Sequence, residues 1–168
     1  VGDIENNTKK IIKAIKKGSE TYHADIIVFP ELCVSSYPPE DLLLRSAFNN
    51  SIDNALEKIK PETKNIRVIL GYPLRKDEKL YNACGLIHNG EIKKTYYKQY
   101  LPNYGVFDEK RYFSRGNETC LFEINGVTAA LSICEDIWVS KPTADAAAAN
   151  AKILFNINAS PYDKNKNS

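Results

Sequence analysis

Residues 127–133 form an apolar run that stops at Cys134 and is followed by the carboxylates Glu135 and Asp136. This feature constrains the chain most strongly. Small and β-branched side chains suit a packed strand, whereas carboxylates cannot continue such burial without partners. The run therefore predicts a buried strand that carries a thiol to its end. Taken alone, Cys134 is better explained as a small buried hydrophobic residue, because free cysteine is among the most buried residue types.

The length and charge of the chain fit one globular domain. Its 168 residues are 43% hydrophobic and 26% charged, with no leader and no apolar run of membrane-spanning length, so we expect a cytoplasmic protein. The 23 basic and 21 acidic residues nearly cancel, which gives little basis for binding nucleic acid. No CxxC pair occurs, and His23 and His88 do not lie at ligand spacing to any cysteine. We therefore expect reduced thiols and no metal site.

The first half of the chain alternates helices with apolar strands. Residues 6–23 predict an amphipathic helix with a lysine face, begun by Asn7 or Thr8. The continuous apolar runs 24–29 and 66–73 predict strands that are covered on both faces and end at a proline. Between them, Asp41 is expected to cap a helix over residues 42–48, and a second helix is expected to stop before Pro61. Such alternation is typical of an α/β layer fold.

The second half carries two hairpin signals. Asn89-Gly90 and Asn125-Gly126 each separate two β-rich segments, and their easy positive φ favours a type I′ turn. The irregular segment 98–116 lies between the hairpins, and long loops of this kind are often functional. An alanine-rich helix over about residues 143–152, a buried strand over 153–157 and a frayed tail over 163–168 complete the predicted elements.

Three predicted strands end at a residue that can do chemistry: Glu31, Lys98 and Cys134. Strand ends line the crevice of an open α/β sheet, so these residues can meet. A thiol needs a base to become a nucleophile, a desolvated carboxylate can serve, and an ammonium can stabilise a developing oxyanion. The backbone N–H that follows the nucleophile can add a second donor. Each residue also has a plainer explanation, because most glutamates and lysines are solvated at the surface.

Three stretches, taken in order, resemble the nitrilase superfamily: Phe-Pro-Glu-Leu at 29–32, Lys-Gln-Tyr-Leu-Pro-Asn-Tyr at 98–104 and Cys-Glu-Asp-Ile-Trp at 134–138. More narrowly, the chain is similar to the N-terminal glutaminase domain of glutamine-dependent NAD synthetases, which carry runs like those at 36–43, 100–104, 107–113 and 158–162. The resemblance spans essentially the whole chain. It implies an α/β fold, a nitrilase-like αββα sandwich of mixed sheet.

The resemblance also implies roles for individual residues. Glu31 matches the general base, Lys98 the oxyanion-stabilising lysine and Cys134 the nucleophile that attacks the side-chain amide of L-glutamine. Glu109 matches a carboxylate that lies beside this triad without touching the substrate. A carboxylate at Glu135 suits the α-ammonium of glutamine. The positions that match the glutamine pocket are Tyr37, Tyr104, Phe107, Glu135 and Ser160.

The family pattern has a strand before residue 1 and further strands and a synthetase domain after residue 162, so residues 1–168 are expected to be one partial domain, incomplete at both ends. No cofactor is expected here; ATP and Mg²⁺ are expected only in the synthetase domain, which amidates deamido-NAD with the ammonia. The expected partners are L-glutamine, the synthetase domain of the same full-length chain and further copies in a homo-oligomer, with no nucleic acid and no membrane. This chain alone is expected to make no NAD.

Three other functions stay open at this point. The same triad would serve a stand-alone amidase or carbamoylase, and the chain could be a catalytically inactive fragment. The interleaved lysines and aromatic residues at 93–100 also match a single-stranded nucleic-acid binder, although the near-neutral charge counts against it.

Overall fold

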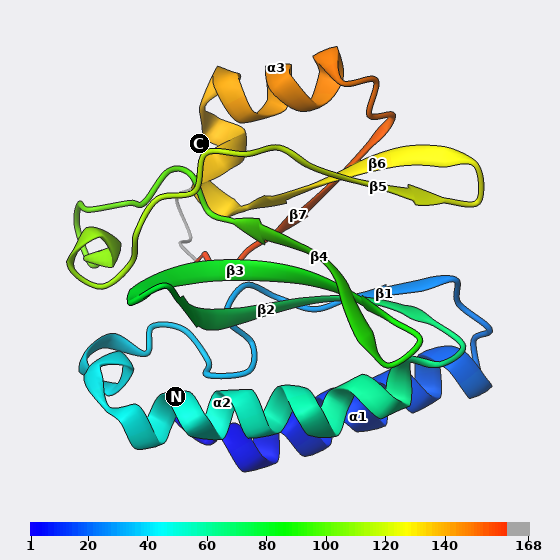
Figure 1. The fold of residues 1–168 in the computed structure, drawn as a ribbon, viewed down its shortest axis with the longest axis horizontal. Coiled ribbons are helices and arrows are strands. Elements are labelled where there is room, and N and C mark those ends of the chain that lie inside the picture. Colours follow the sequence, from blue (N-terminus) through cyan, green and yellow to red (C-terminus); the bar gives the residue numbers. More distant parts are fainter. Residues whose placement is uncertain (161–168) are drawn as a thin grey trace, which may run out of the picture.

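The computed structural model describes residues 1–160 and arranges them in four layers (Figure 1). Helices α1 (Ile4–Glu20) and α2 (Ser46–Ile59) form the first layer, and α3 (Ser140–Ala148) lies in the fourth. One inner sheet contains β1 (Ile26–Val28), β2 (Arg67–Lys76), β3 (Lys79–His88) and β4 (Glu91–Tyr97). The other contains β5 (Cys120–Ile124), β6 (Val127–Ile133) and β7 (Ile153–Ile157). The expected αββα sandwich is confirmed.

Both sheets are mixed. In the first, the strand order is β1-β2-β3-β4, with β1 parallel to β2 and the other neighbours antiparallel. In the second, the order is β5-β6-β7, with an antiparallel pair followed by a parallel pair. The parallel pairs bring the carboxyl ends of β1 and β2, and of β6 and β7, to one edge of each sheet. Glu31 and Cys134 follow two of these ends.

Two hydrophobic cores explain why β2 and β3 are apolar at nearly every position. Side chains alternate across a strand, so successive residues point to opposite faces. Val68 and Leu70 pack against the helices α1 and α2, whereas Ile69 packs between the two sheets. In the same way, Ala83 packs on the helix side and Cys84 on the sheet side. The expectation of strands covered on both faces is thus confirmed for β2.

The same expectation is wrong for β1, and the expectation of a buried strand over residues 153–157 is wrong for most of β7. Val28 in β1 is 43% exposed, and Ile153 and Leu154 in β7 are 42% and 37% exposed. Within residues 1–160, β1 and β7 each pair with a strand on one side only, so their apolar side chains are incompletely covered. Continuous hydrophobicity indicated a strand correctly in both cases, but it did not tell an outer strand from an inner one.

Both Asn-Gly hairpins are confirmed. Asn89 and Gly90 have φ values of 52° and 78°, and Asn125 and Gly126 have φ values of 50° and 78°. These are the left-handed values that a type I′ turn requires at its two central positions. The turns join β3 to β4 and β5 to β6.

Several predicted element boundaries are corrected. Helix α1 begins at Ile4, and its cap is Asp3 rather than the expected Asn7 or Thr8. The Asp3 side chain accepts a hydrogen bond from the Asn6 N–H. Asp41 does not cap a helix; it lies in a 3₁₀ turn, Glu40–Leu44, that precedes α2. Helix α3 begins at Ser140 rather than near residue 143.

Pro73 does not end β2, which continues to Lys76. Strand β1 pairs only with residues 67–69 of β2, so at Pro73 the strand has β3 on one side and no strand on the other among residues 1–160. Proline is tolerated at such an edge position, because no ladder partner needs its missing N–H.

Two regions need a separate statement. Pro161, Tyr162 and the tail that was expected to fray lie outside the described residues. Among the helices within residues 1–160, none is both long enough and apolar enough to cross a bilayer.

Candidate active site

Glu31 lies in the turn that follows β1, and it is only 2% exposed. The next residue, Leu32, has a φ of 49°, a left-handed value that turns the chain sharply. Gly71 of β2 allows the turn to sit against the sheet: a Cβ at this position would lie 2.5 Å from the Pro30 carbonyl oxygen. Close backbone packing therefore holds the turn that carries Glu31. The alternative explanation of Glu31 as a solvated surface carboxylate is excluded.

Lys98 follows β4 and is 1% exposed, so it is not one of the solvated lysines. Its Nζ donates to Oε1 of Glu31 at 2.7 Å and to Oε1 of Glu109 at 2.8 Å. Burial lowers the pKa of Lys98, but the two carboxylates outweigh this effect and raise it. Lys98 therefore stays an ammonium inside the protein.

Glu109 comes from a short 3₁₀ turn, Glu109–Arg111, within the long loop. It is 4% exposed, and burial is the main reason that its pKa is raised. Its Oε1 accepts a hydrogen bond from the Tyr37 hydroxyl at 3.0 Å as well as from Lys98. The structure thus places Glu109 in direct contact with Lys98, beside the three residues expected to form the triad.

Cys134 directly follows β6 and begins a 3₁₀ turn, Cys134–Trp138. Its φ is 44°, and a non-glycine residue in this region marks a sharp, strained turn of the kind found at functional sites. The Sγ atom lies 3.5 Å from Oγ of Ser160. The neighbouring Ala159 N–H donates to Oε2 of Glu31 at 3.0 Å, so two adjacent residues connect the thiol to the carboxylate.

The charges of the buried acids act on this thiol. Burial raises the pKa of Cys134, the negative charge of Glu31 raises it further, and Lys98 and the Ser160 hydroxyl oppose the change. Cys134 is buried, with 8% of its surface exposed. A thiol in this environment is protonated at neutral pH and needs a base to take its proton.

Sequence reasoning missed Asn82, which lies in β3 between the acids. Its Nδ2 donates to Oε1 of Glu31 at 2.8 Å and to Oε2 of Glu109 at 3.4 Å. A polar residue within the apolar segment of β3 was the one available signal.

Asp136 was noted as a carboxylate that needs partners, but the partners could not be named. It is fully buried, and burial raises its pKa while its hydrogen bonds oppose the change. Three of its four donors come from the segment around Lys98, and the fourth is the residue before Cys134. These donors are the Tyr96 hydroxyl at 2.8 Å and the backbone N–H groups of Gln99 at 3.1 Å, Tyr100 at 2.8 Å and Ile133 at 3.2 Å. Asp136 therefore ties the Lys98 segment to the turn of the thiol.

The five residues expected to line a glutamine pocket gather around this site. The rings of Tyr37 and Tyr104 both lie against Phe107, with centroid distances of 6.2 Å and 5.6 Å. The Tyr104 hydroxyl donates to both oxygens of Glu135, at 3.1 Å and 3.0 Å. Ser160 completes the group through its contact with Cys134.

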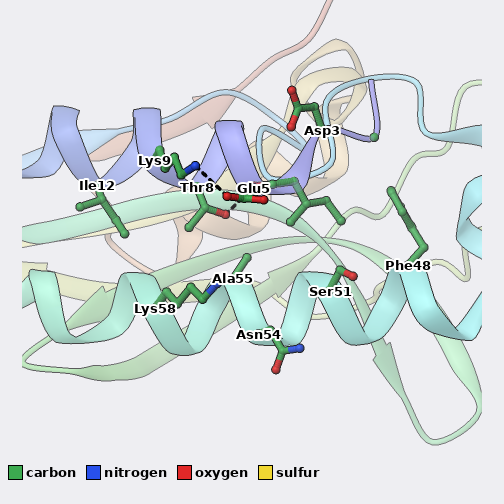
Figure 2. Close-up of a pocket in the computed structure, with 12 residues that line it drawn as sticks. Asp3, Glu5, Thr8, Lys9, Ile12, Phe48, Ser51, Asn54, Ala55 and Lys58 are labelled. Carbon is green, nitrogen blue, oxygen red and sulfur yellow. Dashed lines mark hydrogen bonds and ion pairs between the residues drawn. The ribbon is translucent and has the colours of Figure 1, made fainter.

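Two of the hollows among the described residues differ in their relation to this site. A cavity of about 200 Å³ is lined by Tyr37 and Glu109 together with parts of the two loops that carry them. Figure 2 shows the other, a groove of about 480 Å³ between α1 and α2 with Glu5, Lys9 and Lys58 at its rim. The groove lies in the outer helical layer, and none of the predicted site residues lines it.

Two further observations bear on other chemistries. Within residues 1–160, no three His, Cys, Asp or Glu side chains are placed to hold a metal ion. The segment proposed for nucleic-acid stacking offers little aromatic surface, because Tyr96 is 2% exposed and Tyr97 packs on Tyr81 with a centroid distance of 4.5 Å. Lys98, from the same segment, is buried.

Comparisons with known proteins all point to one family. A family model described as carbon-nitrogen hydrolase matches residues 1–167. The chain is 47% identical over 171 residues to a glutamine-dependent NAD(+) synthetase of Aquifex aeolicus, covering 99% of this chain and 29% of the relative. It is 40% identical over 170 residues to that of Thermotoga maritima, with coverage of 99% and 29%. The chain thus spans less than a third of the length of these relatives.

Solved structures give the same result. The glutamine-dependent NAD+ synthetase of Acinetobacter baumannii, in complex with ADP, matches with a TM-score of 0.94 and 36% identity over 99% of this chain and 31% of that one. An amidase from Nesterenkonia sp. AN1 matches with a TM-score of 0.85 and 23% identity over 97% of this chain and 64% of that one, which shows a shared fold.

Proposed function

Because this chain belongs to the carbon-nitrogen hydrolase family, we propose that it hydrolyses the side-chain amide of L-glutamine and releases ammonia. One observation carries the proposal: a lysine ammonium is buried between two carboxylates, next to a cysteine in a strained turn. Glutamine is proposed over other amides because the relatives that match 99% of this chain are named glutamine-dependent NAD(+) synthetases.

The proposed chemistry begins with the thiol. Glu31 takes the proton of Cys134, and the sulfur attacks the amide carbon to form a tetrahedral intermediate. The Lys98 ammonium and the backbone N–H of Glu135 stabilise the negative charge on its oxygen. The proton then passes from Glu31 to the leaving nitrogen, the carbon–nitrogen bond breaks, and ammonia leaves a γ-glutamyl thioester. Glu31 next takes a proton from water, whose oxygen attacks the thioester; glutamate leaves and the thiol recovers its proton.

In this proposal, Glu135 pairs with the α-ammonium of glutamine, and the Tyr104 hydroxyl holds the carboxylate in place. Tyr37 and Phe107 pack along the aliphatic part of the substrate. Ser160 donates to the thiolate that forms on Cys134, in keeping with its 3.5 Å contact.

The use of the ammonia is proposed from the relatives. We assign residues 1–168 to the glutaminase domain of a glutamine-dependent NAD synthetase, with the ammonia passing to an ATP- and Mg²⁺-dependent synthetase domain that amidates deamido-NAD. A homo-oligomer in the cytoplasm is part of the same proposal. All four cysteines lie within the described residues and are unpaired, which suits a reducing compartment.

The test is ammonia release from L-glutamine, compared with release from short aliphatic amides and N-carbamoyl amino acids. We expect the wild-type protein to prefer L-glutamine, and Cys134→Ala to lose about 10³-fold or more of the rate. Cys33→Ala is the matched control and should retain it. Preference for a simple amide or a carbamoyl substrate would replace the proposal with a stand-alone amidase or carbamoylase. No hydrolysis of any of these compounds would indicate an inactive fragment.

A further inference from the structure

Asn82 contacts the site through both its side chain and its backbone. The residue is fully buried in β3, and its side-chain Nδ2 donates to carboxylate oxygens of both Glu31 and Glu109. Its backbone carbonyl accepts a hydrogen bond from the Lys98 N–H at 2.9 Å. One residue thus touches all three members of the buried ionic cluster.

The donors on Glu31 are distributed unequally between its two oxygens. Oε1 accepts from Lys98 Nζ at 2.7 Å and from Asn82 Nδ2 at 2.8 Å. Oε2 accepts from the Ala159 N–H alone among the described residues, at 3.0 Å. The donor to Oε2, Ala159, precedes the serine whose hydroxyl lies 3.5 Å from the Cys134 sulfur, so Oε2 is the oxygen that is linked to the thiol through adjacent residues. Within residues 1–160, Oε2 accepts one hydrogen bond where Oε1 accepts two, so Oε2 has a lone pair left to accept a proton.

The Asn82 side chain is poorly satisfied in other respects. Its Oδ1 is buried and has no hydrogen-bond partner among the described residues. Buried acceptors without a donor are rare in native proteins because they cost stability. Packing alone would favour an apolar side chain here, so the residue is best explained by what its Nδ2 donates to.

We propose that Asn82 is a positioning residue, which saturates Oε1 of Glu31 so that Oε2 takes the proton from Cys134. The inference rests on the proposed function for its chemical meaning. The proton leaves sulfur for Oε2 as the carbon–sulfur bond forms, and Oε2 returns it to the nitrogen of the leaving ammonia. Lys98 keeps its own protons throughout and serves the oxyanion.

Loss of the Asn82 donor should change the pH dependence of the site. A hydrogen bond to a carboxylate favours its ionised form, which is the form that accepts the proton of the thiol. Asn82→Ala should therefore shift the acid limb of the rate upward by about one pH unit. Asn82→Asp keeps the volume of the side chain but adds a third carboxylate, and it should shift the limb further in the same direction.

Two rates should be measured from about pH 4 to about pH 8: kcat/KM for glutamine, and the addition of acrylamide to Cys134 followed by peptide mass spectrometry. The second rate also needs a base for the thiol but does not need glutamine to bind. Asn49→Ala is the matched control, since Asn49 is also buried and its Nδ2 also donates two hydrogen bonds, but to backbone carbonyls. It should lower stability without moving either limb.

The outcomes separate the two proposals. A shifted acrylamide limb in the Asn82 variants, with no glutamine hydrolysis by the wild type, supports the role of Asn82 and removes the proposed function. If Asn82→Ala and Asn82→Asp fold and the acid limbs of both rates stay at the wild-type pH, the inference is overturned, whatever the maximal rates of the variants are. If Asn82→Ala does not fold, the isosteric Asn82→Asp decides alone.

Discussion

Lys98 is a charged side chain with no contact to water, held by carboxylates on two sides. The side-chain exposures are 0% for Lys98, 1% for Glu31 and 5% for Glu109. Desolvation makes such a group costly unless its partners remain. The cluster carries two acids and one base, so removal of the ammonium would leave two buried carboxylates uncompensated.

At this scale we predict that Lys98→Met lowers the free energy of unfolding by about 3–5 kcal/mol at neutral pH. Burial already raises the pKa of Glu109, and loss of the Lys98 ammonium, which opposes this effect, should raise it further in the variant. A raised folded pKa means stability that is present at low pH and lost as pH rises, so acidification should restore part of the loss. Urea unfolding at pH 5 and pH 7 measures both effects.

Lys93→Met is the control for this prediction. Lys93 also pairs with a glutamate, Glu91, but both side chains are substantially exposed. Exposed pairs contribute about 0–1 kcal/mol, so this variant should unfold almost like the wild type. Equal losses in the two variants would contradict the importance of burial.

At the scale of elements, the site depends on how closely a strand approaches the turn beside it. Gly71 lies in β2 against the turn that carries Glu31, where a Cβ would meet the Pro30 carbonyl oxygen at 2.5 Å and the Leu32 nitrogen at 2.6 Å. Both contacts are with backbone atoms, which cannot rotate away. Gly116 packs in the same way against the end of β4, where a Cβ on Gly116 would lie 2.2 Å from the Tyr97 carbonyl oxygen.

Gly71→Ala should therefore displace the Glu31 turn. We expect a loss of about 1–3 kcal/mol in unfolding free energy from overpacking and about a 100-fold loss of kcat/KM, because small displacements of a catalytic group are costly. Gly126→Ala is the comparison: its φ of 78° also disfavours alanine, but its hairpin is remote from the site. It should lose stability and keep its activity; an active Gly71→Ala variant would argue against this account of the turn.

The elements also show what could be predicted from the sequence. The Asn-Gly hairpins were predictable because positive φ is a local requirement. The strand ends before Glu31 and Cys134 were predictable because an apolar run stops where polarity begins. The strand end before Lys98 was predictable because the β-rich second arm of a hairpin gives way to an irregular segment. The exposure of β1 and β7 was not, since it depends on which strands become outer strands. The partners of Asp136 were not predictable either, because they come together only when the two sheets pack.

At the scale of the whole molecule, the four thiols lie in different environments. Burial raises the pKa of Cys33 to about 12 and that of Cys120 to about 11, and it raises that of Cys84 well above its ordinary value. The pKa of Cys134 is also raised, first by burial and then by the negative charge of Glu31. In the function proposed above, however, Glu31 takes the proton of this thiol. Reactivity at neutral pH should therefore be confined to one of the four.

We predict that a small amide electrophile at pH 7 modifies Cys134 first. At pH 8 about 10⁻³ or less of Cys33 and Cys120 is thiolate, and their rates should rise about tenfold with each pH unit above that. The rate at Cys134 should depend less steeply on pH. Peptide mass spectrometry after timed labelling gives each rate, and the protein in urea, where all four thiols should react alike, is the reference. Early modification of Cys33 would count against an activated Cys134.

The burial of Asp136 has a consequence for the molecule as a unit. One carboxylate receives hydrogen bonds from the end of β4 in one sheet and from the end of β6 in the other. The two sheets cannot slide or part without breaking bonds to that same side chain. The Lys98 segment and the Cys134 turn are therefore held together where the two sheets meet. A separation of the sheets should disrupt the candidate site even while the outer helices stay folded.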